Sequence, residues 1–97
     1  MEFRKGILFI RLKGDLNKDT IKGIIDKDFK YVVLNIDDMY SIDSYSIKYL
    51  NKIYRLYENN NNKFIICDKF NVSRKLLKDI PKINREYDAF ELLERMI

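Results

Sequence analysis

Four short runs of branched and aromatic residues alternate along this 97-residue chain with segments of helical periodicity. This alternation constrains the fold most, because parallel strands that follow one another in sequence need a crossover connection, usually a helix. The run at residues 31–36, Tyr-Val-Val-Leu-Asn-Ile, is almost continuously apolar, as in strands that are covered on both faces. The pattern predicts an α/β fold with a mostly parallel sheet of four to five strands.

Residue composition and spacing place the individual elements. We expect strands at residues 7–12, 31–36, 64–67 and 83–87, with residues 2–4 as an edge strand. We expect helices at residues 17–26, 44–57 and 72–80, and a last one capped by Asp88, about four in all. In the second helix a stripe of apolar side chains is expected to face the core: Ile47, Leu50, Ile53, Tyr54, Leu56 and Tyr57.

The segments between these elements carry turn and capping residues. Residues 37–43 are expected to form a polar connector, and residues 58–63 include four consecutive asparagines, which favour turns. Either Asp43 or Ser44 is placed to cap the helix that follows the connector. In so short a chain we expect all elements to belong to one domain, residues 1–97.

The composition argues against catalysis and against a bound metal. The chain has no histidine, the commonest general base, and its one cysteine, Cys67, lies inside an apolar run as a buried, inert thiol. The usual zinc ligand sets are therefore missing, and no internal disulfide can form. No glycine-rich phosphate loop or nucleophile motif is present. We expect a protein that is not an enzyme and that uses no cofactor.

The net charge of +4 is compatible with an anionic partner. Acidic residues are interspersed with the basic ones, however, and no run of five or six like charges occurs, which argues against nucleic acid. Residues 1–6 contain no signal-peptide core, and no apolar stretch approaches the length that spans a bilayer. We expect a cytoplasmic protein without direct membrane insertion.

Four carboxylates, Asp37, Asp38, Asp43 and Asp68, lie at or just after the carboxyl ends of expected strands. Ligands bind at that edge of open parallel sheets, and clustered carboxylates suit Mg²⁺. We favour the simpler interpretation that these are ordinary loop carboxylates.

Three short motifs occur in an order that is typical of one family. The first strand ends in Leu-Lys-Gly-Asp-Leu at residues 12–16. The strand Val-Val-Leu-Asn-Ile at residues 32–36 precedes Ile-Asp-Ser at residues 42–44, and a helix, a loop and the strand at residues 64–67 follow. In this order, over almost the whole chain, the sequence resembles the STAS domain of bacterial anti-sigma factor antagonists. The resemblance implies a single STAS-like domain.

The resemblance also implies a site and a partner. In these antagonists the second serine of an Asp-Ser-Ser-Gly loop is phosphorylated by a kinase-like anti-sigma factor, and the unphosphorylated form binds that factor and frees the sigma factor. Asp43 and Ser44 match the first two positions of the loop, Tyr45 stands at the phosphorylated position, and Ser46 replaces the glycine. Lys48 replaces another residue that is commonly small. A kinase-like anti-sigma factor is thus the implied partner, with a role in transcription regulation.

The candidate site is therefore the start of the second helix. The phosphoacceptor candidates are Ser44, Tyr45 and Ser46. The partner-binding candidates are Asp43, Ser44, Tyr45, Ser46, Lys48 and Tyr49; tyrosines such as Tyr45 and Tyr49 supply rigid contact area at interfaces.

Two other interpretations stay open, and the departures from the family's loop favour the first of them. One is an unphosphorylated STAS subunit of a different assembly, such as a stressosome-like complex or a lipid-transport ATPase. The other, from a different class, is a small basic nucleic-acid binder, whose binding would be sensitive to salt.

Overall fold

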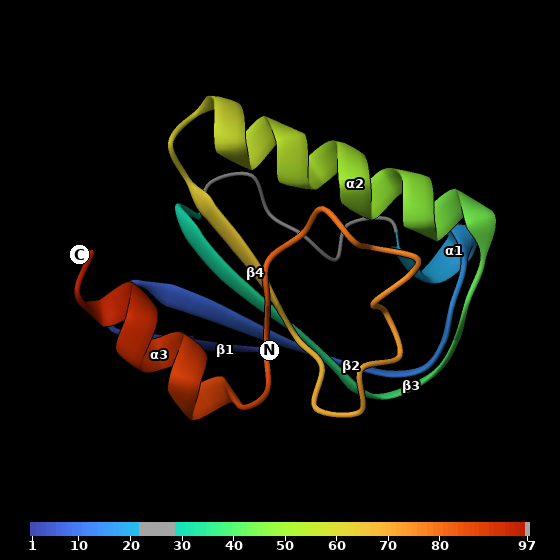
Figure 1. Ribbon diagram of the computed structural model, residues 1–97, viewed down its shortest axis with the longest axis horizontal. Coiled ribbons are helices and arrows are strands. Elements are labelled where there is room, and N and C mark those ends of the chain that lie inside the picture. The colour runs from blue at the N-terminus through green and yellow to red at the C-terminus, as the bar shows by residue number, and fades with distance from the viewer. Residues whose placement is uncertain (22–28, 97) are drawn as a thin grey trace.

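The computed structural model describes residues 1–21 and 29–96, and five strands and three helices lie within them. The elements follow in the order β1 (Glu2–Arg4), β2 (Ile7–Leu16), α1 (Lys18–Ile21), β3 (Tyr31–Ile42), α2 (Ser44–Asn59), β4 (Lys63–Cys67), β5 (Lys82–Ile83) and α3 (Glu86–Glu94) (Figure 1). The predicted α/β class and the strand number are confirmed. About four helices were expected, and residues 22–26 of the first of them lie outside the described part.

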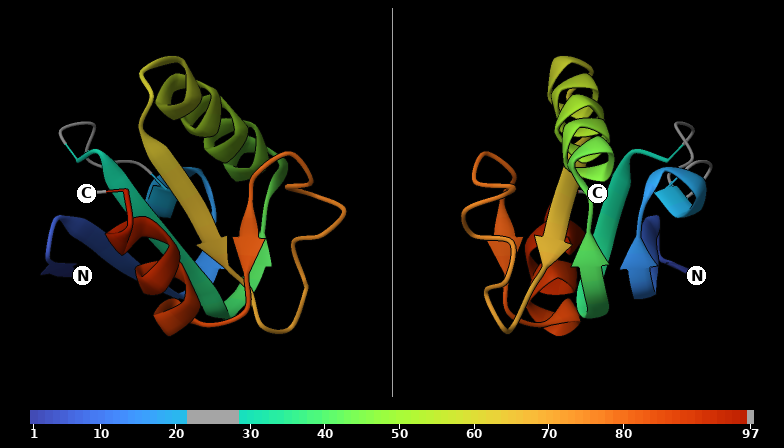
Figure 2. Two further views of the ribbon diagram at one scale, coloured as in Figure 1. Left: turned by 60° about the vertical axis from the view of Figure 1, so that its left-hand side comes forward. Right: turned by 90° about the vertical axis from the view of Figure 1, so that its right-hand side faces the viewer.

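The strands form one sheet in the order β1-β2-β3-β4-β5. β1 pairs antiparallel with β2, and every other neighbouring pair is parallel. Because consecutive strands are neighbours, each parallel step needs a crossover, and α2 makes the one from β3 to β4 (Figure 2).

The sheet has a hydrophobic core on each face, because the apolar residues of β3 and β4 alternate between the two sides. Val32, Leu34 and Ile66 belong to a large cluster that also contains Leu50 and Ile53 of α2. The opposite face is covered by α3, and its cluster is smaller: Ile7, Phe9, Val33, Ile65, Cys67, Ala89 and Leu93. Figure 1 shows α2 and α3 on opposite sides of the sheet, which confirms the prediction of strands covered on both faces.

The α2 stripe is confirmed with one exception. Leu50, Ile53 and Tyr57 are buried, and Ile47 and Tyr54 pack against the same cluster as partly buried side chains. Leu56 is 38% exposed, so its assignment to the core was wrong.

β2 and β3 are longer than the apolar runs predicted, so the polar connector at residues 37–43 is mostly strand. The two strands stay paired out to Leu16 and Ile42, across register shifts on either side of Gly14. Gly14 has a φ of +76°, which glycine adopts without strain, and the bulges let the pair bend. Parallel pairing along a neighbouring strand thus overrides the poor strand propensity of Asp37 and Asp38.

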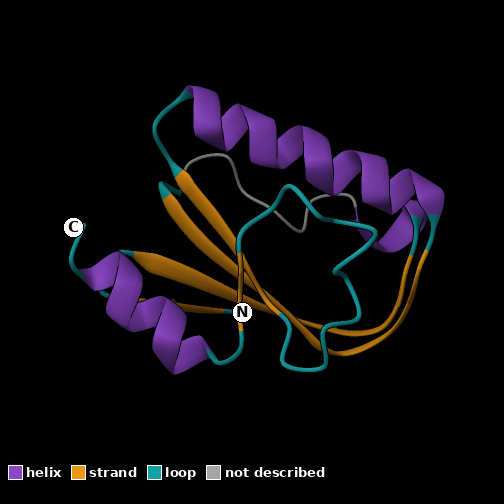
Figure 3. Cartoon of the chain, viewed as in Figure 1, coloured by secondary structure: helices purple, strands orange, loops and turns teal. Residues whose placement is uncertain are grey.

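The predicted helix at residues 72–80 is wrong. This stretch of the β4–β5 crossover is a series of turns, drawn as loop in Figure 3. Asp68 accepts hydrogen bonds from the amides of Val72 and Ser73 and from the Ser73 hydroxyl. The Lys82 ammonium donates to the carbonyls of Leu77 and Ile80. These side chains bond to backbone groups at the two ends of the stretch and hold the turns in place, while Leu77 and Ile80 still reach the α2-side core.

The last strand and helix begin earlier than predicted. β5 is only Lys82–Ile83, and α3 begins at Glu86 rather than after an Asp88 cap. Arg85 occupies the N-cap position, and its guanidinium donates to the Asp88 carboxylate at 2.8 and 3.0 Å. Asp88 therefore stabilises the first turn from within it, where a negative charge favours the helix dipole.

Candidate functional site at the start of α2

The long β2–β3 pair ends where α2 begins, and this sets the position of the candidate site. The Asp43 amide donates to the Leu16 carbonyl at 3.0 Å, which continues the ladder to the edge of the helix. One residue pair earlier, the Ser41 hydroxyl donates to the Asp15 carboxylate at 2.7 Å. The start of α2 is therefore held by the strands beneath it.

Asp43 is the N-cap of α2, which settles the choice between Asp43 and Ser44. Its backbone is extended, with φ −89° and ψ 170°, and its carboxylate accepts from the Ser46 amide at 2.8 Å. The second carboxylate oxygen accepts from the Lys18 amide at 3.3 Å, so one side chain joins the starts of α1 and α2. The Ser46 amide, with a further contribution from the Ser46 side chain, lowers the pKa of Asp43.

The structure divides the phosphoacceptor candidates. Ser44 is the first residue of α2 and is exposed, and Tyr45 is 41% exposed. Ser46 is fully buried, and its hydroxyl has no hydrogen bond of normal geometry within the described residues. Ser46 follows the cap into the core-facing side of the first turn, so a partner or a kinase cannot reach it in this conformation. Ser46 is therefore withdrawn from both candidate sets.

The remaining candidates lie together along α2. Tyr45, Lys48, Tyr49 and Lys52 line a shallow groove with a volume of about 230 Å³. The Lys18 ammonium of α1 lies 5.9 Å from the centre of the Tyr45 ring, near enough for a cation–π interaction. Tyr45 is exposed as predicted, and Lys48 is exposed as well. Tyr49, which we also expected to be exposed, is half-buried and packs against the core. Lys52 was not predicted, although its spacing of four residues from Lys48 places it on the same face.

The carboxylates at the strand ends organise loops. Asp37 accepts from the Lys69 amide at 2.9 Å, and Asp68 holds the turn at residues 72–73. In the described part of the chain, no three potential metal-ligating side chains cluster.

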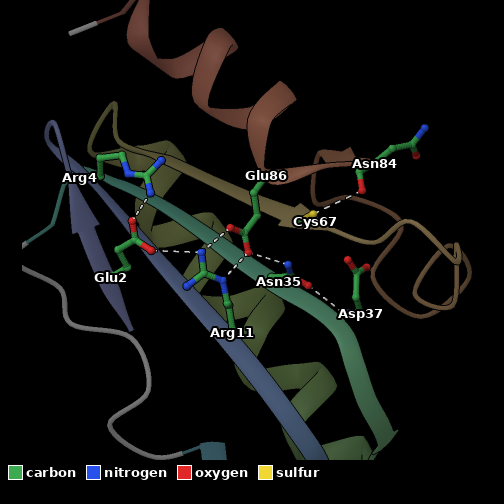
Figure 4. Close-up of polar contacts among 8 residues, drawn as sticks. All are labelled: Glu2, Arg4, Arg11, Asn35, Asp37, Cys67, Asn84 and Glu86. Atoms are coloured by element: carbon green, nitrogen blue, oxygen red, sulfur yellow. Dashed lines mark hydrogen bonds and ion pairs between the residues drawn. The ribbon is translucent and has the colours of Figure 1, made fainter.

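A charged network on the α3 side of the sheet was missed (Figure 4). Glu86 of α3 accepts two hydrogen bonds from Arg11 of β2, at 2.7 and 2.8 Å, and one from Asn35 of β3 at 2.6 Å. Burial opposes ionisation of Glu86, but the bonds from Arg11 and Asn35 outweigh it and lower its pKa. The sequence signal was the presence of Arg11 and Asn35 within otherwise apolar strands.

This network forms one wall of a cavity of about 310 Å³. The cavity is lined by residues from β1, β2 and α3: Glu2, Arg4, Phe9, Arg11, Glu86, Tyr87 and Phe90. Its arginines are already paired with its glutamates, with Arg4 at 2.5 Å from Glu2 and Arg11 at 3.2 Å. The pair of Arg11 with Glu86 joins α3 to the sheet, and together these pairings leave the cavity little net charge to select a ligand.

Cys67 lies at the end of β4 beneath the start of α3. Its thiol is fully buried and contacts the Asn84 carbonyl at 3.5 Å. Burial, together with nearby carboxylates, raises the pKa of Cys67 to about 11, which agrees with the prediction of an inert thiol.

The sheet order, the crossovers and an aspartate-capped α2 at the end of β3 define a STAS-like fold, as the sequence predicted. The structure is similar to a solved structure of the anti-sigma factor antagonist SpoIIAA in its unphosphorylated form, with a TM-score of 0.72. The match covers 99% of this chain and 94% of that chain at 16% sequence identity, a level at which the likeness concerns the fold. No protein-family model and no curated protein sequence matches the chain.

No helix of the described part has both the length and the apolar character needed to cross a bilayer.

Proposed function

We propose that this protein is a regulatory binding module of the anti-sigma factor antagonist type. The proposal rests on one observation: a fold that matches SpoIIAA over nearly its whole length, with an exposed serine directly after the aspartate that caps α2. The partner we propose is a kinase-like anti-sigma factor, and its binding would release a sigma factor and so regulate transcription in a bacterial cytoplasm. On this proposal the chain acts by binding and is not an enzyme.

Ser44 is the residue we propose as the switch. It begins a 16-residue helix, where the dipole and the first amides favour a negative charge. A phosphate there would add roughly two negative charges to the surface on which we propose that the partner docks. Because docking would then require desolvation of that charge, the phosphorylated form would bind less tightly.

The second candidate function is an unphosphorylated STAS subunit of another assembly, such as a stressosome-like complex or a lipid-transport ATPase. The observation that favours it is the loop itself. Tyr45 stands at the position that the resemblance assigns to the phosphorylated serine, and its hydroxyl lies much farther from the backbone than a serine hydroxyl does. Such a module would keep the docking surface without the switch.

The test begins with the complex that the tagged protein forms in its native cell. Mass spectrometry identifies both the partner and any phosphate on the peptide that contains Ser44, Tyr45 and Ser46. The identified partner is then purified and titrated calorimetrically with wild type, Ser44→Asp and Asn84→Asp. Asn84 is exposed beyond β5, so it adds the same charge away from α2.

We expect a kinase-like partner and a loss of about tenfold in affinity for Ser44→Asp, with no change for Asn84→Asp. Unchanged affinity for Ser44→Asp would remove Ser44 from the docking surface. A transporter or scaffold partner, with the peptide unmodified, would instead select the second candidate function.

A further inference from the structure

The outer face of α2 carries more positive than negative charge. Lys48, Lys52 and Arg55 are all exposed, and the helix has one carboxylate, Glu58, near its far end. The first turn contains no acidic residue. Lys18 adds a fourth cation beside Tyr45.

The ion pairs of the described residues lie away from α2. Within residues 1–21 and 29–96, the ion pairs join Arg4, Arg11 and Arg85 to Glu2, Glu86 and Asp88. All of these residues belong to β1, β2 or the region around α3. The cations of α2 take part in none of them, so their charge is available to a ligand.

The groove combines this charge with apolar contact area. Tyr45 and Tyr49 lie one helical turn apart, and Lys48 and Lys52 repeat that spacing beside them. Two aromatic rings flanked by ammonium groups suit a carboxylate-bearing segment that also carries an apolar side chain. The groove volume of about 230 Å³ fits a few side chains rather than an extended polyanion.

We propose that the α2 groove docks an acidic segment of a protein partner. The inference deepens the proposed function, on which it rests, because it states the chemistry of the partner's contact surface. A protein segment is favoured over nucleic acid or a lipid surface because the cations form one short stripe beside two tyrosines, and acidic residues are interspersed with the basic ones along the chain.

The same geometry explains how Ser44 regulates docking. Ser44 and Lys48 are four residues apart on α2, so a phosphate on Ser44 lies on the face that carries Lys48. It would pair with that lysine and repel an acidic partner segment. Phosphorylation thus removes an attraction and adds a repulsion at one end of the groove.

The test uses a defined probe, a synthetic peptide of aspartate, glutamate and one central leucine, titrated into the isotope-labelled full chain by NMR. The charge-reversal variant is K48E/K52E, and the matched control is K78E/R95E, whose two cations are exposed in the β4–β5 crossover and just after α3. Each lysine- or arginine-to-glutamate change lowers the charge by two, so both variants start from +4 and reach zero. The dispersed amide spectrum of each variant reports that it is folded.

We expect shift changes centred on Tyr45, Lys48, Tyr49 and Lys52, and an affinity that falls about tenfold in K48E/K52E and less than about twofold in the control. Added salt is expected to weaken binding. Equal losses in both variants, shifts centred elsewhere, or no binding would each overturn the inference. So would tighter binding at the groove by phosphatidylserine vesicles or duplex DNA than by the peptide.

These outcomes are distinguishable from failure of the proposed function. If the purified partner responds to Ser44→Asp but not to K48E/K52E, the docking site stands and its acidic complement is wrong. If it responds to neither, the site at the start of α2 is wrong.

Discussion

The charged network that joins α3 to the sheet provides a sharp stability prediction. The perturbation is Arg11→Met, which keeps most of the aliphatic stem and removes the guanidinium. Glu86 loses both of its bonds from Arg11 and keeps the one from Asn35. The side chains of Arg11 and Glu86 are 45% and 23% exposed, so solvent screens the pair. We therefore expect a loss of only about 1 kcal/mol in the free energy of unfolding at neutral pH.

The pH dependence separates the ion pair from packing of the stem. In the folded protein the pKa of Glu86 lies below its ordinary value of 4.5, so its contribution to stability is present above that value. That contribution is lost as the pH falls through the folded pKa. Without Arg11, burial of the carboxyl loses its main opposing effect and the pKa of Glu86 rises. The stability difference between wild type and Arg11→Met should therefore shrink as the carboxyl becomes protonated in both.

Urea unfolding followed by circular dichroism at neutral and at acidic pH is the assay. With a slope of about 1–2 kcal/mol/M, the expected loss moves the neutral-pH midpoint by about 0.5–1 M. Arg4→Met is the control, because among residues 1–21 and 29–96 Arg4 is ion-paired with Glu2 alone, at the exposed sheet edge. This change should cost less than about 0.5 kcal/mol. An equal loss for Arg11→Met at both pH values would refute the reasoning and assign the effect to packing.

Two other predictions concern exposure. Tyr45→Ala should weaken partner binding and cost less than about 0.5 kcal/mol of stability, because its ring is 41% exposed, and Tyr87→Ala on α3 is the exposed control that should leave affinity unchanged. A large drop in melting temperature for Tyr45→Ala would make that ring structural. Cys67, with a pKa of about 11, should resist a thiol reagent at pH 8 until the protein unfolds, since about one thiol in a thousand is then ionised. Labelling of native protein as fast as that of urea-unfolded protein would contradict this.

The strand and helix cores were predictable because local patterns determine them. The apolar run at residues 31–36 lies within β3, and the stripe of Leu50, Ile53 and Tyr57 lies on the buried side of α2. These patterns indicate which side chains are buried in the folded protein, and burial of apolar area is the main effect that stabilises the fold.

Element boundaries were not predictable because partners distant in sequence set them. The polar half of β3 is strand because β2 pairs with it out to Ile42. Residues 72–80 look helical in sequence, yet they form turns that Asp68 and Lys82 hold by hydrogen bonds at the two ends of the stretch. A local sequence pattern predicts neither the register of β2 against β3 nor the contact of Lys82 with the turns at residues 72–80.

The candidate site was predictable in position but not in its exposed members. The aspartate after an apolar strand placed the start of α2 within the site, and Asp43 caps it. Ser46 looks equivalent to Ser44 in sequence, but the two residues point to different sides of the first turn, so one is buried and the other exposed.

The sequence by itself determined the α/β class, the order of the strands and the position of α2, because alternating apolar periodicities specify which faces are buried. Only the tertiary structure decided which serine is accessible, that Lys52 joins Tyr45, Lys48 and Tyr49 in one groove, and that Arg11, Asn35 and Glu86 meet across the sheet. These contacts join residues from different elements, or depend on how one helix is rotated against the sheet. Packing of the whole core fixes the rotation of the helix, so a local sequence pattern cannot predict it.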